Sequence, residues 1–235
     1  MTATAAPPPR HSLDQRPGLV VDSGAVPEWV LHWCERSGRA VRARTVQATA
    51  VAARTGDSVI VLRAAPLAQR PRIAAALRNL PDDAAVLADA IDAAVHLCGS
   101  LTVVHGVPLS FGERSVGLAD ALARGENLLL DARALVDAAG ADVPVDTKLE
   151  RAWPHELVGE QLDADLLAIG GSRADANGSL GLVAATAVRH APCAVLLATR
   201  PAAHRLDLLS DAVRTRRPWI PIPRIPAESL AGRTP

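Results

Sequence analysis

The segment from Ala164 to Arg200, ADLLAIGGSRADANGSLGLVAATAVRHAPCAVLLATR, decides the fold of this chain. Two short apolar runs, Leu166–Ile169 and Ala194–Ala198, flank a glycine-rich turn and a helical segment that ends near His190. Continuous apolar runs on either side of a helix are typical of parallel strands buried between helices, so the segment predicts a βαβ unit. Its loop leaves the carboxyl end of the first strand and leads to a helix N-terminus. Open α/β sheets bind ligands at that place, and phosphates above all.

The residues before this segment continue the alternation of strands and helices. Apolar runs predict strands over Ile73–Leu77, Leu101–Val107 and Val143–Leu149. Helical spacing predicts helices over 81–97, closed by Gly99, over 118–139, closed by Gly140, and over 154–162. With the segment above, the order is β-α-β-α-β-α-β-α-β. We therefore expect an α/β fold with a five-stranded, mostly parallel sheet and helices on both faces.

Residues 18–66 form a shorter set of elements. We expect strands over Gly18–Val21 and Asp57–Leu62 and helices over Val26–Cys34 and Val41–Arg54. The stretch TVQATAVAARTGDSVIVLRAAP (45–66) parallels GLVAATAVRHAPCAVLLATRP (181–201), with Val59 aligned on Val195 at an offset of 136 residues (195 − 59). We interpret residues 18–66 as a truncated first copy of the domain that follows, an N-terminal αβ remnant. Chance similarity between two segments rich in alanine and valine is the alternative.

Residues 70–200 resemble a universal stress protein domain. The resemblance rests on the GGSR turn, the glycine that opens the next helix, and HAPC (190–193) before the last strand. RIAAALRNLPDDAAVLADAIDAA (72–94) resembles the first strand and helix of that family, and SLTVVHGVP (100–108) its second strand. The resemblance implies a Rossmann-like fold of the adenine nucleotide alpha hydrolase type. It also implies tandem copies and dimers formed through the last strand.

The nucleotide loop of this family has the pattern Gly, two residues, Gly, nine residues, Gly, then Ser or Thr. Gly171 takes the first position here, Ala174 the second and Gly181 the third, while Leu182 takes the hydroxyl position. Six residues separate Ala174 from Gly181, so the loop is three residues short. Ala174 adds a methyl group where backbone must come close to a ligand. The loop therefore predicts a damaged phosphate site.

The family also implies an aspartate after the first strand that contacts the sugar or base. Arg78 holds this position, and a guanidinium only donates hydrogen bonds, so it cannot accept them from a ribose. We expect a degenerate pocket with no obligatory cofactor, no catalytic residues and no metal. An anion held by Arg173, ATP itself, and glycines that serve only a tight turn are the alternatives. The pocket positions are Leu77, Arg78, Gly106, Gly170, Gly171, Ser172, Arg173, Gly181 and Leu182.

Composition excludes several classes of partner. The formal net charge is zero and aromatic residues make up 2% of the chain, so we expect no nucleic-acid surface. No run approaches the roughly 18 apolar residues that span a membrane, and residues 1–17 resemble a disordered segment rather than a secretory signal. The three cysteines, Cys34, Cys98 and Cys193, are scattered as in reduced cytoplasmic proteins.

Partners are expected at two places. The strand Ala194–Ala198 would be an apolar sheet edge, which needs a cover. A second subunit or, within the chain, Asp57–Leu62 could supply it, giving a homodimer or an intramolecular pseudo-dimer. The tail, residues 201–235, is rich in proline and arginine, and Arg214–Pro226 is a candidate site for a protein partner.

Three functions are consistent with these residues. The first is a non-enzymatic stress-response or regulatory protein. The second is an ATP-binding switch or slow ATP hydrolase, and the third is an adaptor that acts through its tail.

Overall fold

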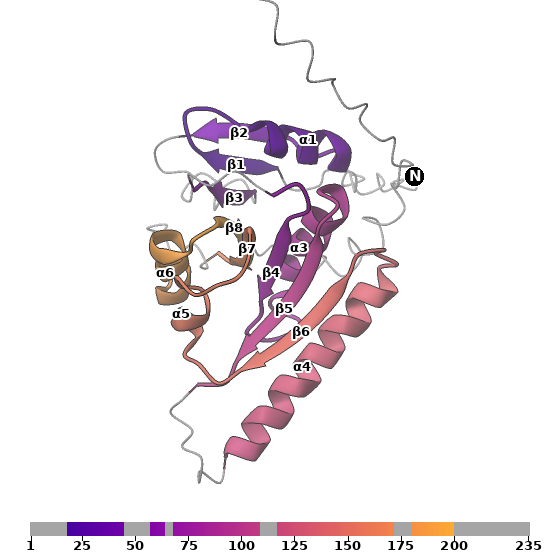
Figure 1. Cartoon of the computed structure of the whole chain (residues 1–235), viewed down its shortest axis with the longest axis vertical. Helices are drawn as coiled ribbons and strands as arrows, with labels where there is room; N and C mark the ends of the chain where they lie inside the picture. The colour runs from indigo at the N-terminus through magenta and orange to yellow at the C-terminus, as the bar shows by residue number, and fades with distance from the viewer. Residues whose placement is uncertain (1–17, 45–56, 64–67, 109–116, 172–179, 200–235) are drawn as a thin grey trace, which may run out of the picture.

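The computed structural model describes residues 18–44, 57–63, 68–108, 117–171 and 180–199 (Figure 1). Expectations for residues 1–17, for most of the helix over 41–54 and for the tail lie outside these ranges. The same holds for Ser172, Arg173 and Ala174 in the nucleotide loop.

Eight strands of the described residues form one sheet, in the order β2-β1-β3-β8-β7-β4-β5-β6. The strands are β1 Leu19–Asp22, β2 Val41–Arg44, β3 Ser58–Val61, β4 Arg72–Ala76, β5 Ser100–Gly106, β6 Val145–Glu150, β7 Leu166–Gly170 and β8 Ala194–Ala198. The helices are α1 Glu28–Ser37, α3 Ala84–His96, α4 Leu118–Ala138, α5 Pro154–Leu157 and α6 Leu182–His190.

The sheet has two parts of opposite direction. Strands β8, β7, β4, β5 and β6 are mutually parallel, which confirms the predicted parallel sheet of this region. Strands β2, β1 and β3 are parallel to one another and join the first part through an antiparallel pair, β3 with β8. The prediction of a five-stranded sheet was therefore wrong, because β1, β2 and β3 extend it to eight strands among the described residues.

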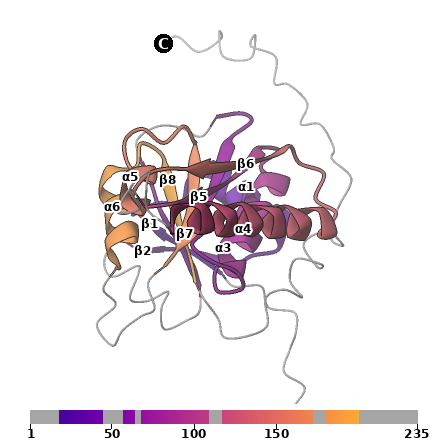
Figure 2. The ribbon, with the colours of Figure 1, turned by 90° about the horizontal axis from the view of Figure 1, so that it is seen from below.

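Helices cover both faces of the sheet (Figures 1 and 2). Alternate strand residues point to opposite faces. Ile73 and Ala75 therefore join the core beneath α1, α3 and α4, whereas Ala74 joins the core beneath α6. In β8, Leu196 faces the first core and Val195 the second. The eight strands thus carry two continuous cores that cross the junction between the two parts.

The junction is the pairing that the sequence predicts between 57–62 and 194–198. Val59 lies opposite Leu197, and Ile60 opposite Leu196, in an antiparallel ladder. Ile60 and Leu196 are both fully buried. The apolar edge of β8 is therefore covered from within the chain.

Local structure corrects three details of the sequence analysis. The predicted helix over Val41–Arg54 is wrong at its start, because Val41–Arg44 is a strand that pairs with β1 in parallel. The left-handed residue after α3 is Cys98 (φ 56°), not Gly99. Gly99 is needed for another reason, since a side chain there would clash with the carbonyl oxygen of Pro71. The helix over 154–162 is one turn, Pro154–Leu157.

Candidate functional site

The predicted pocket positions lie along one edge of the parallel part. Ala76 lies opposite both Val104 and Ile169, and Ile169 lies opposite Leu197. The carboxyl ends of β4, β5, β7 and β8 are therefore neighbours. The predicted positions that the structure describes lie at the ends of these strands, in the segments that follow them or at the start of α6.

The loop after β4 is closed by one of its own carboxylates. Asp83 is 2% exposed and accepts hydrogen bonds from the backbone N–H groups of Arg78 at 2.6 Å and Asn79 at 3.1 Å. Successive N–H groups that converge on one point form an anion-binding concavity, and here a side chain of the same loop fills it. Leu77, predicted to line the pocket, is 4% exposed and belongs to the core.

The Arg78 side chain lies at the surface of this edge. It is 69% exposed, and its guanidinium group lies 3.7 Å from the carboxylate of Asp82. The amide group of Asn79 donates to the same carboxylate at 3.1 Å. Within the described residues, the other end of that amide, Asn79 Oδ1, is a buried acceptor without a hydrogen-bond partner.

Two of the predicted glycines serve packing and strand pairing. A side chain at Gly106 would clash with Leu157 of α5. The N–H group of Gly171 donates to the carbonyl oxygen of Ala198 at 2.9 Å, and a Cβ atom there would lie 3.2 Å from that oxygen. Gly170 ends β7 opposite Ala198. Close approach of neighbouring backbone therefore accounts for Gly106 and Gly171.

The glycine at the start of α6 differs from Gly106 and Gly171 in its surroundings. Gly181 precedes the helix with φ −61°, and a Cβ atom there would meet no atom of the described residues within 4 Å. Leu182, in the predicted hydroxyl position, is 72% exposed. Among the described residues no side chain caps the helix, whose first N–H groups form the positive end of the helix dipole.

Other chemistry is not assembled in the described residues. They contain no group of three or more His, Cys, Asp or Glu side chains placed to hold a metal ion, and no helix long and apolar enough to cross a membrane. Burial raises the pKa of the Cys34 and Cys193 thiols to about 11. His105 contacts the carbonyl oxygen of Leu77 through Nδ1 at 2.8 Å, which fits a structural role.

Comparison with known proteins places this geometry in a family. A model of the universal stress protein family matches residues 69–199, more than half of the chain. The chain belongs to the universal stress protein family. No curated protein matches it.

Solved structures share this fold at low sequence identity. A universal stress protein from Archaeoglobus fulgidus is 22% identical, with 55% of this chain and 98% of that chain covered and a TM-score of 0.45. A putative universal stress protein from Pseudomonas aeruginosa is 16% identical, with coverage of 84% and 66% and a TM-score of 0.48. The cytoplasmic domain of a prokaryotic cation chloride cotransporter is 14% identical, with coverage of 85% and 69% and a TM-score of 0.52. The last match covers 85% of this chain, which is more than the part that the family model matches. The shared fold therefore includes residues outside 69–199.

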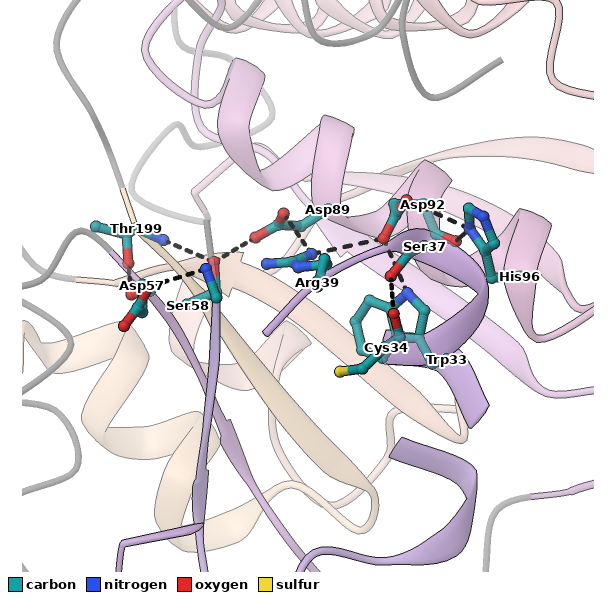
Figure 3. A network of polar contacts seen from close by, with 11 residues as sticks. Trp33, Cys34, Ser37, Arg39, Asp57, Ser58, Asp89, Asp92, His96 and Thr199 are labelled. Atoms are coloured by element: carbon teal, nitrogen blue, oxygen red, sulfur yellow. Dashed lines mark hydrogen bonds and ion pairs between the residues drawn. The ribbon is translucent and has the colours of Figure 1, made fainter. Parts of the chain in front are cut away.

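A buried polar network joins the universal stress protein domain (69–199) to the part before it, which we call the N-terminal unit (18–44 and 57–63). Arg39 lies just after α1, with its guanidinium group 3.0 Å from Asp89 and 3.6 Å from Asp92, both on α3 (Figure 3). The Ser58 hydroxyl donates to Asp89 at 2.5 Å, and the Trp33 indole N–H donates to Asp92 at 2.8 Å. The sequence analysis did not single out any of these charged residues.

The charges in this network shift one another's pKa. Burial alone would raise the pKa of Asp92, but its hydrogen bond with His96 and the charge of Arg39 lower it. Burial also opposes the charge of Arg39, and the two carboxylates outweigh that effect and raise the pKa of the guanidinium group. The guanidinium carbon lies 5.5 Å from the centroid of the Trp33 ring. Arg39 and Asp92 are therefore both ionised at neutral pH.

Proposed function

We propose that this chain is a non-enzymatic, cytoplasmic stress-response or regulatory protein whose nucleotide pocket is degenerate. The observation that carries the proposal is the closed loop after β4. The buried Asp83 carboxylate occupies the N–H groups of Arg78 and Asn79, and the Arg78 side chain turns to Asp82. A nucleotide would have to displace Asp83 from two hydrogen bonds and bring a guanidinium group to a ribose that needs an acceptor.

A nucleotide titration tests this proposal. ATP at about 100 times its Kd would stabilise the folded chain by about 2.7 kcal/mol, which raises Tm by about 5–10 °C at this length. We expect no shift with millimolar ATP and Mg²⁺. Inorganic triphosphate at the same concentration is the control, because it separates binding of an anion from recognition of a nucleotide. A rise of several degrees with ATP but not with triphosphate would show that the pocket works.

The ATP-binding switch is the second candidate, and two observations favour it. Considering the described residues, the space beside Gly181 is open and no side chain caps the helix N-terminus there. Asn79 Oδ1 offers a buried acceptor among the described residues at the same edge of the sheet. The titration above decides between the two candidates, and a measurement of phosphate release by the ATP-loaded chain would then separate a switch from a slow hydrolase.

We also propose that residues 18–66 are a truncated copy that takes the place of a partner subunit. The register of the junction supports this idea. At an offset of 136 residues, Val59 corresponds to Val195 and Ile60 to Leu196. If a two-fold axis perpendicular to the sheet relates the copies, one residue of the ladder must lie opposite its own counterpart. The ladder pairs Ile60 with Leu196, whereas a shift of one residue would lose this agreement.

Side chains beyond the ladder follow the same relation. Arg63 and Thr199 are counterparts at the offset of 136, and each follows the last ladder residue of its own strand by two positions. Arg63 donates to the backbone oxygens of Val188 and of Ala191, at 3.2 Å for the latter, just before β8. The Thr199 hydroxyl donates to the backbone oxygen of Asp57, just before β3. Two corresponding positions thus reach across the junction to backbone oxygens that precede the opposing strand.

Solution mass tests the pseudo-dimer. We expect light scattering to give the monomer mass of 24.5 kDa, because β3 already occupies the edge through which a second subunit would add. Variants with cysteine at both Ile60 and Leu196 should form a disulfide within one chain. A stable dimer in which the disulfide joins two chains would refute the proposal.

A further inference from the structure

The two carboxylates of the network are bonded from across the junction. Asp89 and Asp92 on α3 interact with Arg39, Ser58 and Trp33 of the N-terminal unit (Figure 3). In the opposite sense, the N–H group of Thr199 in the domain donates to the Ser58 hydroxyl at 3.4 Å. Each of these bonds joins the N-terminal unit to the universal stress protein domain. The carboxylates are 4% and 6% exposed, and α1 packs directly against the helix that carries them. The N-terminal unit is therefore what makes these charges buried.

Buried charges of this kind restrict how two surfaces can dock more than they stabilise the docked state. The attraction between buried ions is largely offset by loss of hydration, so apolar side chains of the same shape would hold two surfaces together at least as well. Losing one partner is costly, because the remaining charge stays buried without compensation. In an open state, by contrast, Asp89 and Asp92 would be ordinary hydrated carboxylates on the surface of a helix. The charges thus raise the free energy of any docked arrangement in which they are unpaired, and they do not raise the free energy of the open state.

The N-terminal unit is also built to move as one piece. β1 pairs with both β2 and β3, so its strands are held to one another independently of β8. One stretch of chain, after Arg63, leads from the unit into the domain. Its other links to the domain include the short β3–β8 ladder, the Arg39 network and the contacts of Arg63 and Thr199. The two apolar cores also continue across the junction, so opening would expose apolar surface on both sides.

We propose that the N-terminal unit is a charge-latched cover of the β8 edge. It leaves and redocks as one body while the universal stress protein domain stays folded, and Arg39 with its two carboxylates is the latch. This inference does not depend on whether the nucleotide pocket works. It assigns Arg39 a positioning role in the chain's own regulation of its sheet edge.

Hydrogen exchange read by mass spectrometry on the full chain tests the latch. Arg39→Met leaves two buried carboxylates without a guanidinium group, and amides of residues 19–37 should lose protection by about 100-fold. Amides of β4 and β5 should keep their protection within about 3-fold, which shows in the same sample that the domain is folded. Arg36→Met is the matched control, because Arg36 lies on α1 but is exposed and contacts the Cys98 thiol.

A triple variant separates charge from packing. Arg39→Met with Asp89→Asn and Asp92→Asn removes the three charges and keeps acceptors for Ser58 and Trp33. Its residues 19–37 should regain protection to within about 10-fold of the natural chain. Unchanged protection in Arg39→Met would overturn the latch. A triple variant as exposed as Arg39→Met would show that Arg39 acts by packing on Trp33, and equal loss in β4 and β5 would show that the cover does not open separately.

Discussion

Replacing Ile60 or Leu196 by alanine measures how far the N-terminal unit shares one core with the universal stress protein domain. The two side chains lie opposite each other in the ladder and are fully buried in the same core. Truncating such a side chain costs about 2–5 kcal/mol, which includes the cavity that remains. We expect each single variant to lose about 3 kcal/mol, equivalent to a fall in Tm of about 6–12 °C.

The double variant carries the stronger test. Because the two cavities adjoin, the double variant should lose about 0.5–3 kcal/mol less than the sum of the single variants. Urea unfolding followed by tryptophan fluorescence is the assay, since Trp29 and Trp33 both lie on α1 and report on the N-terminal unit. Leu31→Ala, on the same helix but 45% exposed, is the control and should change stability by less than about 0.5 kcal/mol. Strict additivity, or a loss below about 1 kcal/mol for Ile60→Ala, would refute the view that β3 lies against β8 in solution.

Three further predictions follow from single contacts. The pKa of Asp92 is lower in the folded chain, so the stabilisation it provides is complete above the unfolded pKa of about 3.9 and is lost as pH falls through the folded value. Asp92→Asn should therefore reduce the loss of unfolding free energy between pH 6 and pH 2, measured by urea unfolding. An unchanged loss would exclude Asp92 as its source. Gly99→Ala should cost about 1–3 kcal/mol because the methyl group clashes with the carbonyl oxygen of Pro71. Gly181→Ala should stay within about 0.5 kcal/mol, because its methyl group meets no atom of the described residues within 4 Å. Similar thermal shifts for the two variants would contradict this. Alkylation at pH 8 should modify the exposed Cys98 in the native chain and spare Cys34 and Cys193, because burial raises the pKa of these two thiols to about 11. Rapid modification of all three thiols without denaturant would show that the cores open readily.

Much of the parallel part could be predicted from local patterns. Strands such as β7 and β8 are continuous apolar runs because both of their faces are covered, and no surface pattern interrupts them. The structure of the N-terminal unit was harder to predict from its sequence. Val41–Arg44 reads VRAR, which fits a strand or the start of a helix, and only its pairing with β1 decides between them. Sequence periodicity contains no information on a partner strand whose paired residues lie 22 positions away (41 − 19).

The buried network escaped prediction for a related reason. Asp89 and Asp92 stand among the apolar residues of α3 where an amphipathic helix would face water. A second helix, α1, covers that side, and the sequence of α3 alone cannot show it. One signal was available for the pocket loop: Asp83 precedes a helix and follows a strand by a few residues, and carboxylates in such places often bind nearby backbone N–H groups. That signal would have predicted a loop closed by its own side chain.

The pocket loop and the sheet edge are both filled by the chain itself, and the two are not equally easy to empty. Asp83 is one side chain held by two backbone N–H groups, and an anion that replaced it would recover those bonds. Emptying the β8 edge means removing a strand, its apolar partners and an ionic network together. An intramolecular partner also acts at an effective concentration in the millimolar range, so an external strand competes poorly until the latch is broken. Regulation of this chain should therefore act on the junction through Arg39 and on the pocket loop through direct competition with Asp83.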